Sequence, residues 1–479
     1  MVLWWWSRVA KARIVDITVN GRKVSVEEGK PLIEVCRELG IEVPGFCYWC
    51  ELEPYGACRL CIGEVKLGGV SKLAALCTTY AQQGLEVLTD SEEVRRARRL
   101  ALELLLSEHV GDCIAPCRRA CPAGVDVQGY VAFIANGWLE EAVALILERL
   151  PFPAVVGRVC PAFCEEECRR RLVDEAVAIR DLKRFAADQV LFNGGYGKLI
   201  EKSLELKRLA ERFPSNKKVA VVGGGPAGLT AAFYLGLMGY QVTVFDAFNE
   251  VGGLLCHGIP IYRLPREVVE REISEVVKLS GIEVVVGKAL GKDIHLEELK
   301  RDYDAVVIAI GAWKTRRLSI PGEELKGVVD ALDFLRRVAQ GEKVEVGRKV
   351  VVIGGGNTAI DAARTALRLG AEVTVYYRRT EAEMPAHPKE VAEAREEGVQ
   401  FRFLAAPKRI LGNGKVEAVE FVEMQLGEPG PDGRRKPVPI PGSEFTVSAD
   451  MVLVAIGQMP DVERLESQGL KCERNRLLV

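Results

Sequence analysis

The chain has 479 residues, 48% of them hydrophobic, so it can bury several cores and its length predicts three or four domains. Lys and Arg number 65 against 67 Asp and Glu, which leaves no basic surplus for nucleic acid. The opening MVLWWW is too short for a membrane span or a signal peptide, which favours a loose terminus or a misassigned start. We therefore expect a cytoplasmic protein without a membrane span.

Fourteen cysteines are distributed unevenly along the chain. Twelve of them lie between Cys36 and Cys168, and two lie beyond. Because a cytosolic chain keeps its thiols reduced, such clustering predicts metal centres rather than disulfides.

The first segment has the pattern of a small β-rich domain. Residues 14–26 predict a hairpin around Asn20-Gly21, and residues 31–39 predict a short helix that ends at a glycine. Zinc sites usually take two Cys-x2-Cys pairs, whereas a long loop with three thiolates and a distant fourth suits a 2Fe-2S cluster. The spacing Cys-x10-Cys-x2-Cys-x15-Cys has the second pattern, and its members are Cys47, Cys58, Cys61 and Cys77.

The loop GFCYWCELEPYGACRLC, followed by CTT, resembles the N-terminal 2Fe-2S domain of the large iron–sulfur subunit of complex I and of iron-only hydrogenases. The resemblance covers roughly residues 13–90 and implies a β-grasp ferredoxin domain. Gly56 and Ala57 keep the loop small enough for backbone amides to approach cluster sulfurs. Cys50 is extra to the pattern and is interpreted as a spare thiol, and Cys36 as a small core residue.

The next segment is predicted to be helical and to hold more metal. A helix is predicted from Glu92 to His109, and its apolar face consists of Val94, Ala97, Leu100, Ala101, Leu104 and Leu105. Two more helices are predicted at residues 127–135 and 139–149. Two cysteine triplets with a spacing of four flank these helices, namely Cys113, Cys117 and Cys121, and Cys160, Cys164 and Cys168. Six thiolates supply most of the ligands of two 4Fe-4S clusters, whereas a radical-generating site would use one triplet with unequal spacing.

Residues 218–246, KVAVVGGGPAGLTAAFYLGLMGYQVTVFD, contain a dinucleotide-binding pattern in its full context of strand, glycine turn, helix and second strand. The first glycine makes a tight turn, the second lets a pyrophosphate approach, and the third lets helix and strand close up. The helix N-terminus favours an anion, and the final acid can bond a ribose. The residues predicted to bind this nucleotide are Gly223, Gly225, Pro226, Ala227, Gly228 and Asp246.

The pattern recurs at residues 348–379, RKVVVIGGGNTAIDAARTALRLGAEVTVYYRR, with Ala359 in place of the third glycine. The position that corresponds to the acid is Tyr377, and two arginines follow it. Arginine accommodates a 2′-phosphate that a carboxylate would repel. The first site therefore suits FAD, and the second suits NADPH in preference to NADH. The residues predicted to bind NADPH are Gly354, Gly356, Asn357, Thr358, Arg378 and Arg379.

From about residue 110 to its end, the chain resembles the small subunit of NADPH-dependent glutamate synthase. Dihydropyrimidine dehydrogenase and the electron-bifurcating ferredoxin:NADP oxidoreductase share this module. The matching motifs are VAIRDLKRF, GGL at 252–254, GIPIYRLP at 258–265, AIGAW at 309–313 and YRRTEAEMPA at 377–386. The resemblance implies two clusters that exchange ligands between the triplets, with one held by Cys113, Cys117 and Cys168 and the other by Cys121, Cys160 and Cys164. It also implies flavin contacts near Gly253, Leu254 and Gly311.

Three features depart from that family. An N-terminal Cys of the first cluster is absent, and His109 is either the fourth ligand or a solvated helix cap. The relatives' Glu or Gln ligand of the second cluster aligns with Lys183, which cannot ligate as an ammonium, so this cluster has water or another donor or is incomplete. The chain stops at Val479, before a strand ending in Gly-Asp that touches the flavin in the relatives. Either the sequence is truncated or another polypeptide completes the site.

The predicted fold class is α/β, with paired Rossmann-like domains preceded by a β-grasp 2Fe-2S domain and an α-helical 4Fe-4S domain. The predicted boundaries are 13–90, 91–213, 214–345 with 446–479 returning to it, and 346–445. The Gly- and Pro-rich residues 427–442 are predicted to form a loop. Residues 449–457 are predicted to form a strand that returns the chain to the FAD half and ends at Gly457.

Nicotinamide donates two electrons as hydride, a cluster accepts one at a time, and flavin converts between the two. We therefore predict an NAD(P)H-dependent oxidoreductase with FAD, one 2Fe-2S cluster and two 4Fe-4S clusters, and without a catalytic acid or base. No pattern reveals a pocket for a final substrate, so a redox partner subunit or a ferredoxin is expected, in a possible hetero-oligomer. The alternative is a non-catalytic wiring subunit, and a third, weaker alternative is a zinc-stapled structure.

Overall fold

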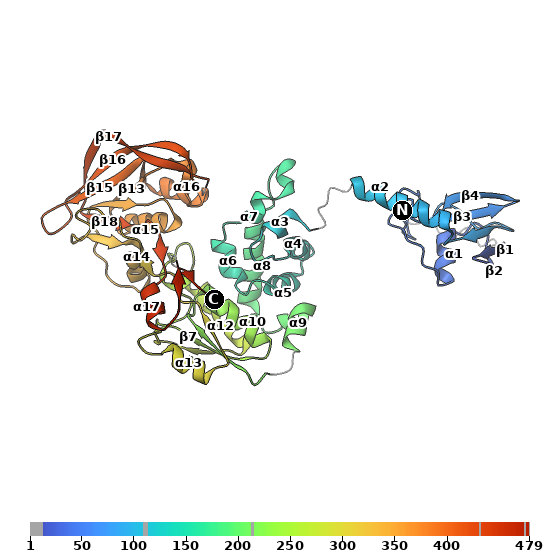
Figure 1. Ribbon diagram of the computed structural model, residues 1–479, viewed down its shortest axis with the longest axis horizontal. Helices are drawn as coiled ribbons and strands as arrows, with labels where there is room; N and C mark the ends of the chain where they lie inside the picture. The colour runs from blue at the N-terminus through green and yellow to red at the C-terminus, as the bar shows by residue number, and fades with distance from the viewer. Residues whose placement is uncertain (1–12, 109–113, 212–214, 431–432, 474–475, 479) are drawn as a thin grey trace. The chain divides into compact units, whose positions relative to one another are not determined.

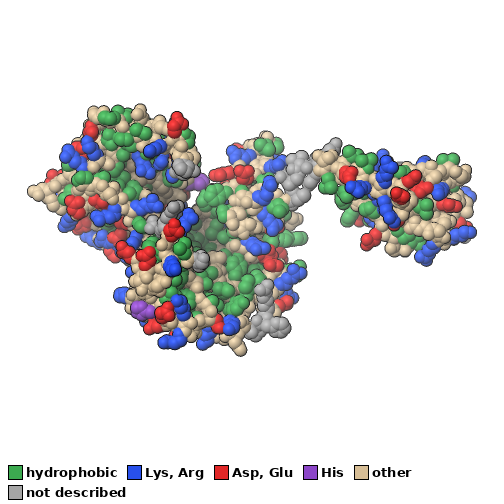
Figure 2. All heavy atoms as spheres, in the orientation of Figure 1, with side chains coloured by type: hydrophobic (Ala, Val, Ile, Leu, Met, Phe, Trp, Pro, Cys, Tyr) green, Lys and Arg blue, Asp and Glu red, His purple; other side chains and the backbone are tan. Residues whose placement is uncertain are grey.

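The computed structural model describes residues 13–108, 114–211, 215–430, 433–473 and 476–478. The chain divides into two compact units, residues 1–113 and residues 114–479, and each is described by itself. In the described ranges, no helix combines the length and the apolar character needed to cross a membrane. Positive and negative side chains are interspersed on the face of each unit that Figure 2 shows.

The first unit is a mixed five-stranded sheet in the order β2-β1-β5-β3-β4 (Figure 1). Its strands are β1 (Ile14–Val19), β2 (Arg22–Glu27), β3 (Ile62–Leu67), β4 (Val70–Ala75) and β5 (Glu86–Leu88). Asn20 and Gly21 both have positive φ between β1 and β2, which confirms the predicted hairpin. Helix α1 (Leu32–Glu38) buries Leu32 and Ile33 against the inward side chains of β1, which confirms the expected β-grasp domain.

Helix α2 (Glu92–Glu108) packs with the first unit, which ends at residue 113 by its contacts, whereas the sequence places the domain boundary at residue 91. Val94 is fully buried, and Arg98 Nε donates a hydrogen bond to the carbonyl of Ile62 in β3, at 2.9 Å. Beyond Arg98 the apolar face of α2 is exposed, with Leu100 57% and Leu104 59% accessible. The amphipathic pattern thus predicted the helix but not that the second half of its apolar face is exposed.

The second unit begins with a series of helices, and Cys117, Cys121, Cys160, Cys164 and Cys168 lie in or next to the shortest of them. The helices are α3 (Pro116–Ala120), α4 (Val127–Ala135), α5 (Leu139–Leu147), α6 (Pro153–Val159), α7 (Phe163–Glu166), η1 (Arg169–Leu172), α8 (Ile179–Asn193), η2 (Leu199–Lys202) and α9 (Leu204–Ala210). Helices α6 and α8 approach closely at Gly157, where a Cβ would lie 2.7 Å from the Cα of Arg184. Glycine at this position therefore permits the close packing of the two helices.

The first nucleotide-binding half is a parallel sheet in the order β8-β7-β6-β9. Its elements are β6 (Lys218–Val222), α10 (Pro226–Leu237), β7 (Gln241–Phe245), α11 (Leu254–His257), α12 (Arg266–Ser280), β8 (Glu283–Val285), α13 (Leu296–Asp302) and β9 (Ala305–Ile308). One hydrophobic core joins this half to the helices before it, because Val143, Ala186 and Leu206 pack in the same cluster as Phe233 and Val269.

The second nucleotide-binding half is a parallel sheet in the order β11-β18-β12-β13-β14. Its elements are β11 (Val328–Asp330), α14 (Ala331–Ala339), β12 (Lys349–Ile353), α15 (Asn357–Arg368), β13 (Glu372–Tyr377), η3 (Glu381–Glu383), α16 (Pro388–Glu397), β14 (Gln400–Phe403) and β18 (Met451–Val454). An antiparallel sheet is attached to it, formed by β15 (Ala405–Leu411), β16 (Ala418–Pro429) and β17 (Arg435–Ser448).

Two predictions about this half are wrong. Most of residues 427–442 belong to the hairpin of β16 and β17 rather than to a loop. Strand β17 lies at the edge of its sheet, where prolines such as Pro437 and Pro439 are tolerated because an edge strand can leave one side without N–H donors.

The expected returning strand, β18, lies between β11 and β12 in the second sheet and not in the FAD half. Because β11 belongs to the same sheet, the chain enters the second half before residue 345. The return is made by β19 (Gln458–Met459), which pairs with β10 (Lys314–Thr315), and by α17 (Val462–Ser467), β20 (Cys472–Glu473) and β21 (Arg476–Leu477). Leu465 of α17 packs against the FAD-half sheet at Ala220 and Val222.

Candidate functional site

The first glycine loop has the geometry that a pyrophosphate site needs. Gly223 has a φ of 108°, and a Cβ on Gly228 would lie 1.8 Å from the Gly223 carbonyl oxygen. A Cβ on Gly225, by contrast, would meet only the Cα of Gly253, at 3.9 Å. The second glycine therefore leaves open space at the start of α10, where the helix N-terminus favours a phosphate.

The carboxylate of Asp246 holds the first glycine loop through hydrogen bonds. Its carboxylate accepts hydrogen bonds from the N–H groups of Gly224 (2.6 Å) and Phe248 (2.8 Å). Burial raises the pKa of this carboxyl, and the two N–H donors oppose that shift. The Asp246 carboxylate therefore fixes the glycine loop. A ribose hydroxyl would donate a hydrogen bond to one of its remaining lone pairs.

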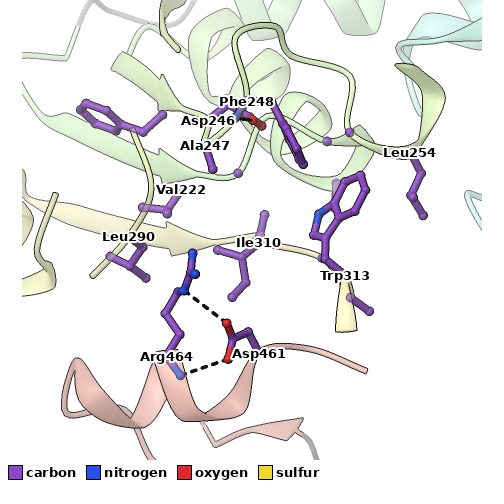
Figure 3. Close-up of a pocket in the computed structure, with 18 of the residues that line it drawn as sticks. Val222, Asp246, Ala247, Phe248, Leu254, Leu290, Ile310, Trp313, Asp461 and Arg464 are labelled. Atoms are coloured by element: carbon purple, nitrogen blue, oxygen red, sulfur yellow. Dashed lines mark hydrogen bonds and ion pairs between the residues drawn. The ribbon is translucent and has the colours of Figure 1, made fainter. Parts of the chain in front are cut away.

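A cavity of about 370 Å³ extends from this loop (Figure 3). Phe248 and Trp313 form one wall with ring centroids 4.9 Å apart, and Leu254 and Ile310 also face the space. Arg464 of α17 lies across the cavity and forms an ion pair with Asp461 at 3.3 Å. A long apolar cavity that ends at a glycine loop fits the adenosine and pyrophosphate parts of FAD.

The second glycine loop repeats this design with different chemistry. Gly354 has a φ of 149°, and a Cβ on Gly356 would meet only Pro385, at 4.0 Å. Gly355 packs against the ring of Tyr377, as Gly224 packs against Asp246 in the first copy. The Tyr377 hydroxyl donates to the carbonyl of Glu383 at 2.8 Å. The middle glycine of each loop therefore packs against the residue at the end of the second strand or directly after it.

The residues that follow Gly356 hold the neighbouring loop. Asn357 Oδ1 accepts a hydrogen bond from the N–H of His387 at 3.0 Å, and Thr358 lies in the first turn of α15. The two arginines at the end of β13 have different surroundings. Arg378 is exposed, whereas Arg379 is 8% accessible and its Nε donates to the carbonyl of Arg435 at 2.7 Å. Arg379 therefore anchors the β16–β17 hairpin, and Arg378 is the more accessible cation.

The four cysteines predicted to bind a 2Fe-2S cluster lie together in the first unit. Burial raises the pKa of the Cys77 thiol to about 12, with further contributions from Cys61, Cys47 and Cys58. The N–H of Cys58 donates to Cys47 Sγ at 3.5 Å, and the N–H of Phe46 donates to Cys58 Sγ at 3.4 Å. Backbone donors thus approach the sulfurs in the way that a ferredoxin loop requires.

Among the cysteines of the second unit, Cys117, Cys121 and Cys164 pack against the core around Tyr130. Burial raises the pKa of Cys117, and Cys168 raises it further. Burial raises the pKa of Cys164 to about 11, with Cys160 and Cys121 contributing. His109 and Cys113 lie outside the described residues, and the division of the ligands between two clusters stays a prediction.

These sulfurs are not grouped as a compact single-ion site. In the described ranges, no group of three or more His, Cys, Asp or Glu side chains is arranged to hold one metal ion.

Several residues of the site were missed from the sequence. Phe248 and Trp313 form the cavity wall, and buried His257 stacks on Phe248 with centroids 4.4 Å apart. The signal available for them was the aromatic content of the segments directly after Asp246 and Gly311. Arg464 gave no sequence signal, because α17 meets the cavity only through the tertiary fold.

The chain has two glycine loops, each on a parallel sheet, and two different patterns of clustered cysteines come before them in the sequence. Together these features define a dinucleotide-dependent iron–sulfur flavoprotein. Residues 217–479 match the family model of the pyridine nucleotide-disulphide oxidoreductases, and the chain belongs to that family. Residues 12–92 match a 2Fe-2S iron–sulfur cluster binding domain, and residues 106–194 match dihydropyrimidine dehydrogenase domain II with its 4Fe-4S cluster. These matches confirm the predicted fold class and the predicted cofactor classes, FAD with NAD(P)H, 2Fe-2S and 4Fe-4S.

Three relatives show how far the similarity reaches. The NADPH-Fe(3+) oxidoreductase subunit beta of Geobacter sulfurreducens is 45% identical, over 73% of this chain and 51% of that one. The NADP(+)-dependent formate dehydrogenase subunit beta of Moorella thermoacetica is 42% identical, over 74% and 52%. The glutamate synthase [NADPH] small chain of Halomonas elongata is 38% identical, over 72% and 73%, which confirms the predicted resemblance. The chain thus spans about half the length of the Geobacter and Moorella relatives.

Proposed function

We propose that this chain passes electrons between NADPH and an acceptor or donor in a partner protein, through FAD and iron–sulfur clusters. The observation that carries the proposal is the hydrophobic core that the FAD half shares with α5, α6 and α8, the helices next to the cysteine-bearing segments. Because α5, α6 and α8 pack in one cluster with α10 and α12, the flavin site and the thiol groups belong to one packed body. Electron transfer needs a donor and an acceptor that are held in fixed positions, which one packed body provides.

The roles proposed for the residues follow from their surroundings. Gly225 and Gly356 leave room for the two pyrophosphates, and Asp246 and Tyr377 hold the loops around them. Arg378 offers the charge that a 2′-phosphate needs and so favours NADPH. A bound flavin supplies the conversion between hydride and single electrons. The protein itself positions the cofactors and tunes their reduction potentials, and no side chain is needed as an acid or base.

The number and the ligands of the clusters are also part of the proposal. We assign one 2Fe-2S cluster to Cys47, Cys58, Cys61 and Cys77. We assign one 4Fe-4S cluster to Cys113, Cys117 and Cys168, with His109 as the candidate fourth ligand, and a second to Cys121, Cys160 and Cys164. The proximity of Cys117, Cys121 and Cys164, which pack against one core around Tyr130, supports cluster binding in this region.

A partner completes the proposed reaction. Among the relatives, two are named as beta subunits and one as a small chain, which supports a partner subunit for this chain. A ferredoxin is the other acceptor or donor that fits one-electron chemistry. We place the protein in the cytoplasm because its clustered cysteines need a reducing compartment.

Anaerobic purification and titration with NADPH test the proposal. About ten irons and one FAD per chain are expected from one 2Fe-2S and two 4Fe-4S clusters. NADPH should bleach the flavin absorbance and reduce an artificial dye, and NADH should do so less efficiently. Protein that contains iron but neither retains flavin nor reduces dye, even with its partner present, is instead a wiring subunit, and the proposal fails.

Gly356→Ala and Gly197→Ala form a matched pair of variants for this experiment. The added methyl meets nothing within 4 Å at Gly197, and at Gly356 it meets only Pro385 at 4.0 Å. Both variants should fold, but only Gly356→Ala places a methyl group where the NADPH pyrophosphate would approach. Loss of NADPH-dependent bleaching in this variant alone supports the assignment of the second loop, and equal activity in both contradicts it.

A further inference from the structure

Residues 258–265 of the FAD half contact the NADPH half directly. They follow α11, which begins at Leu254 in the wall of the FAD cavity. The hydroxyl of Tyr262 donates a hydrogen bond to the backbone carbonyl of Asp361 at 3.4 Å, and Arg263 Nη1 lies 2.6 Å from both carboxylate oxygens of Asp361. Asp361 belongs to α15, the helix that begins at the second glycine loop. The segment therefore joins the wall of the FAD cavity to the helix that carries the NADPH-binding loop.

Tyr262 also contacts α15 further along that helix. The guanidinium carbons of Arg364 and Arg368 lie over the Tyr262 ring, 4.9 and 4.2 Å from its centroid. A cation over the face of an aromatic ring is attracted by the ring quadrupole, and more strongly where water is excluded. Arg364 is only 4% accessible, so this contact lies inside the protein. Tyr262 thus holds one face of α15 over two turns.

Arg263 connects α15 to a second helix of the NADPH half. Its Nε lies 3.3 Å from Glu390 of α16, and Glu390 also accepts a hydrogen bond from Arg364 at 2.9 Å. The side chains of Arg263 and Asp361 are both largely buried. Charge-assisted hydrogen bonds between guanidinium and carboxylate groups add geometric specificity, and little water can replace them here. Arg263 therefore fixes the direction as well as the distance of these helices from the FAD half.

The covalent connection between the two halves is narrow by comparison. The chain enters the second half after β10 and returns at β19, and these paired strands are two residues long each. Two domains of one chain move relative to each other unless their interface restricts the motion. Side-chain contacts such as those of Tyr262 and Arg263 are therefore needed to fix the relative positions of the two glycine loops.

Hydride transfer is the step that depends on those positions. NADPH gives one hydride to FAD, which leaves NADP⁺ and two-electron-reduced FAD, and no other reactant is needed. The reacting atoms must approach to about 3 to 3.5 Å, and a displacement of about 1 Å costs about a hundredfold in rate. Given the proposed function, on which this inference rests, we propose that Tyr262 and Arg263 are positioning residues for this step. They hold α15, and with it the NADPH-binding loop, at a fixed place relative to the flavin cavity.

Tyr262→Leu tests the inference in the full chain with its cofactors bound. Leu stays apolar at this half-buried position and removes both the ring and the hydroxyl, while the ion pair of Arg263 with Asp361 remains. Anaerobic stopped flow with excess NADPH separates the limiting rate of flavin bleaching from the dissociation constant of NADPH. We expect the limiting rate to fall at least about tenfold and the dissociation constant to change by less than about twofold.

The double variant Arg263→Met with Asp361→Leu separates positioning from stability. It removes both buried charges, so neither is left without its partner. A positioning role predicts a thermal midpoint near that of the wild type together with a limiting rate lowered at least about tenfold. A wild-type rate together with a wild-type midpoint overturns the inference, because the pair would then serve stability alone. If this variant does not fold, Tyr262→Leu decides by itself.

Arg395→Met is the matched control. It removes an ion pair with Glu381 at 2.8 Å and a cation–π contact with Phe401 at 5.3 Å, and both contacts lie inside the NADPH half. The limiting rate should therefore stay at the wild-type value. An equal loss of rate in Arg395→Met and Tyr262→Leu would overturn the inference, since any weakened contact in that half would then be sufficient.

The flavin spectrum gives a readout that does not depend on turnover. NADP⁺ should perturb the flavin absorbance where its nicotinamide ring reaches the flavin. Tyr262→Leu should lose most of this perturbation, while calorimetry shows an unchanged affinity for NADP⁺. A wild-type perturbation with a wild-type limiting rate overturns the positioning role and leaves the cofactor assignment in place. A wild-type chain that neither retains flavin nor is bleached by NADPH contradicts the proposed function instead.

Discussion

The carboxylate of Glu272 accepts a hydrogen bond from the backbone N–H of Ala154 at 2.7 Å, 118 residues away in the sequence. Its second oxygen accepts from the N–H of Val155 at 2.8 Å, and the hydroxyl of Tyr196 donates to the first at 2.5 Å. Glu272 lies on α12 of the FAD half, whereas Ala154 lies in the first turn of α6. Because α6 ends directly before Cys160, one buried carboxylate holds the helix that delivers a proposed cluster ligand.

Replacing Glu272 with Ala should destabilise the second unit strongly. Glu272 is fully buried, so the substitution leaves two N–H groups and a hydroxyl without an acceptor. Each unsatisfied buried donor costs about 1 to 3 kcal/mol, so a loss of about 3 to 5 kcal/mol is expected. Urea denaturation followed by tryptophan fluorescence measures it. Glu267→Ala, which removes an exposed carboxylate of the same helix, should cost less than about 0.5 kcal/mol.

The same carboxyl should make stability depend on pH. Burial raises the pKa of Glu272 from 4.5 to about 7, against the opposing effect of its three donors. Between these two values the folded chain holds a proton that the unfolded chain has lost, so the free energy of unfolding decreases as pH rises and levels off above about 7. Urea midpoints across this window should show that slope in the wild type. In Glu272→Gln the contribution should vanish, and an identical slope in both contradicts the assignment.

The glycine loops could be predicted because their chemistry is local. The turn, the pyrophosphate approach and the close packing of helix on strand each need glycine at a fixed offset, so the spacing alone predicted the tight surroundings of Gly223 and Gly228 and the open space at Gly225. The cysteine groups were predicted for the same reason. The spacing could not predict the structural role of Asp246 and Tyr377. Each of these residues supports the middle glycine of its loop.

Long-range contacts were beyond prediction. The acceptor role of Glu272 depends on a helix that lies far away in the sequence, and a single Glu in an amphipathic helix gives no sign of it. The β16–β17 hairpin was missed because its prolines and glycines normally indicate a loop, and only its place at a sheet edge tolerates them. The strand β18 was assigned to the wrong sheet because parallel strands carry no signal of their neighbours.

Gly225→Ala should weaken FAD binding without unfolding the chain. Gly225 has a φ of −75°, which suits any residue, and the new methyl would touch only the Cα of Gly253, at 3.9 Å. The methyl occupies the space that we assign to the pyrophosphate, so at least about a tenfold loss of affinity is expected. The measurement is retained flavin per chain after dialysis. Full retention of flavin would contradict this placement of FAD.

Arg378→Ala should reduce the preference for NADPH. A charge-assisted contact to a phosphate contributes about 1.5 to 3 kcal/mol, so kcat/KM for NADPH should fall by about ten- to a hundredfold while that for NADH changes little. Arg379→Ala should differ, because Arg379 holds the carbonyl of Arg435 and its loss should loosen the β16–β17 hairpin. Equal losses for both nucleotides in Arg378→Ala would contradict 2′-phosphate recognition by this residue.

Arg263 and Asp361 connect the two nucleotide-binding halves through a buried ion pair. Arg263 Nη1 lies 2.6 Å from both carboxylate oxygens, and burial raises the pKa of Asp361 to about 6 although Arg263 lowers it. Arg263→Met leaves that carboxylate buried without its partner and should cost about 3 to 5 kcal/mol. Arg263→Met combined with Asp361→Leu removes both charges and should recover much of this loss, because desolvation of the pair is then avoided. The double-mutant cycle in thermal unfolding measures the coupling, and additive losses would show that the two residues act independently.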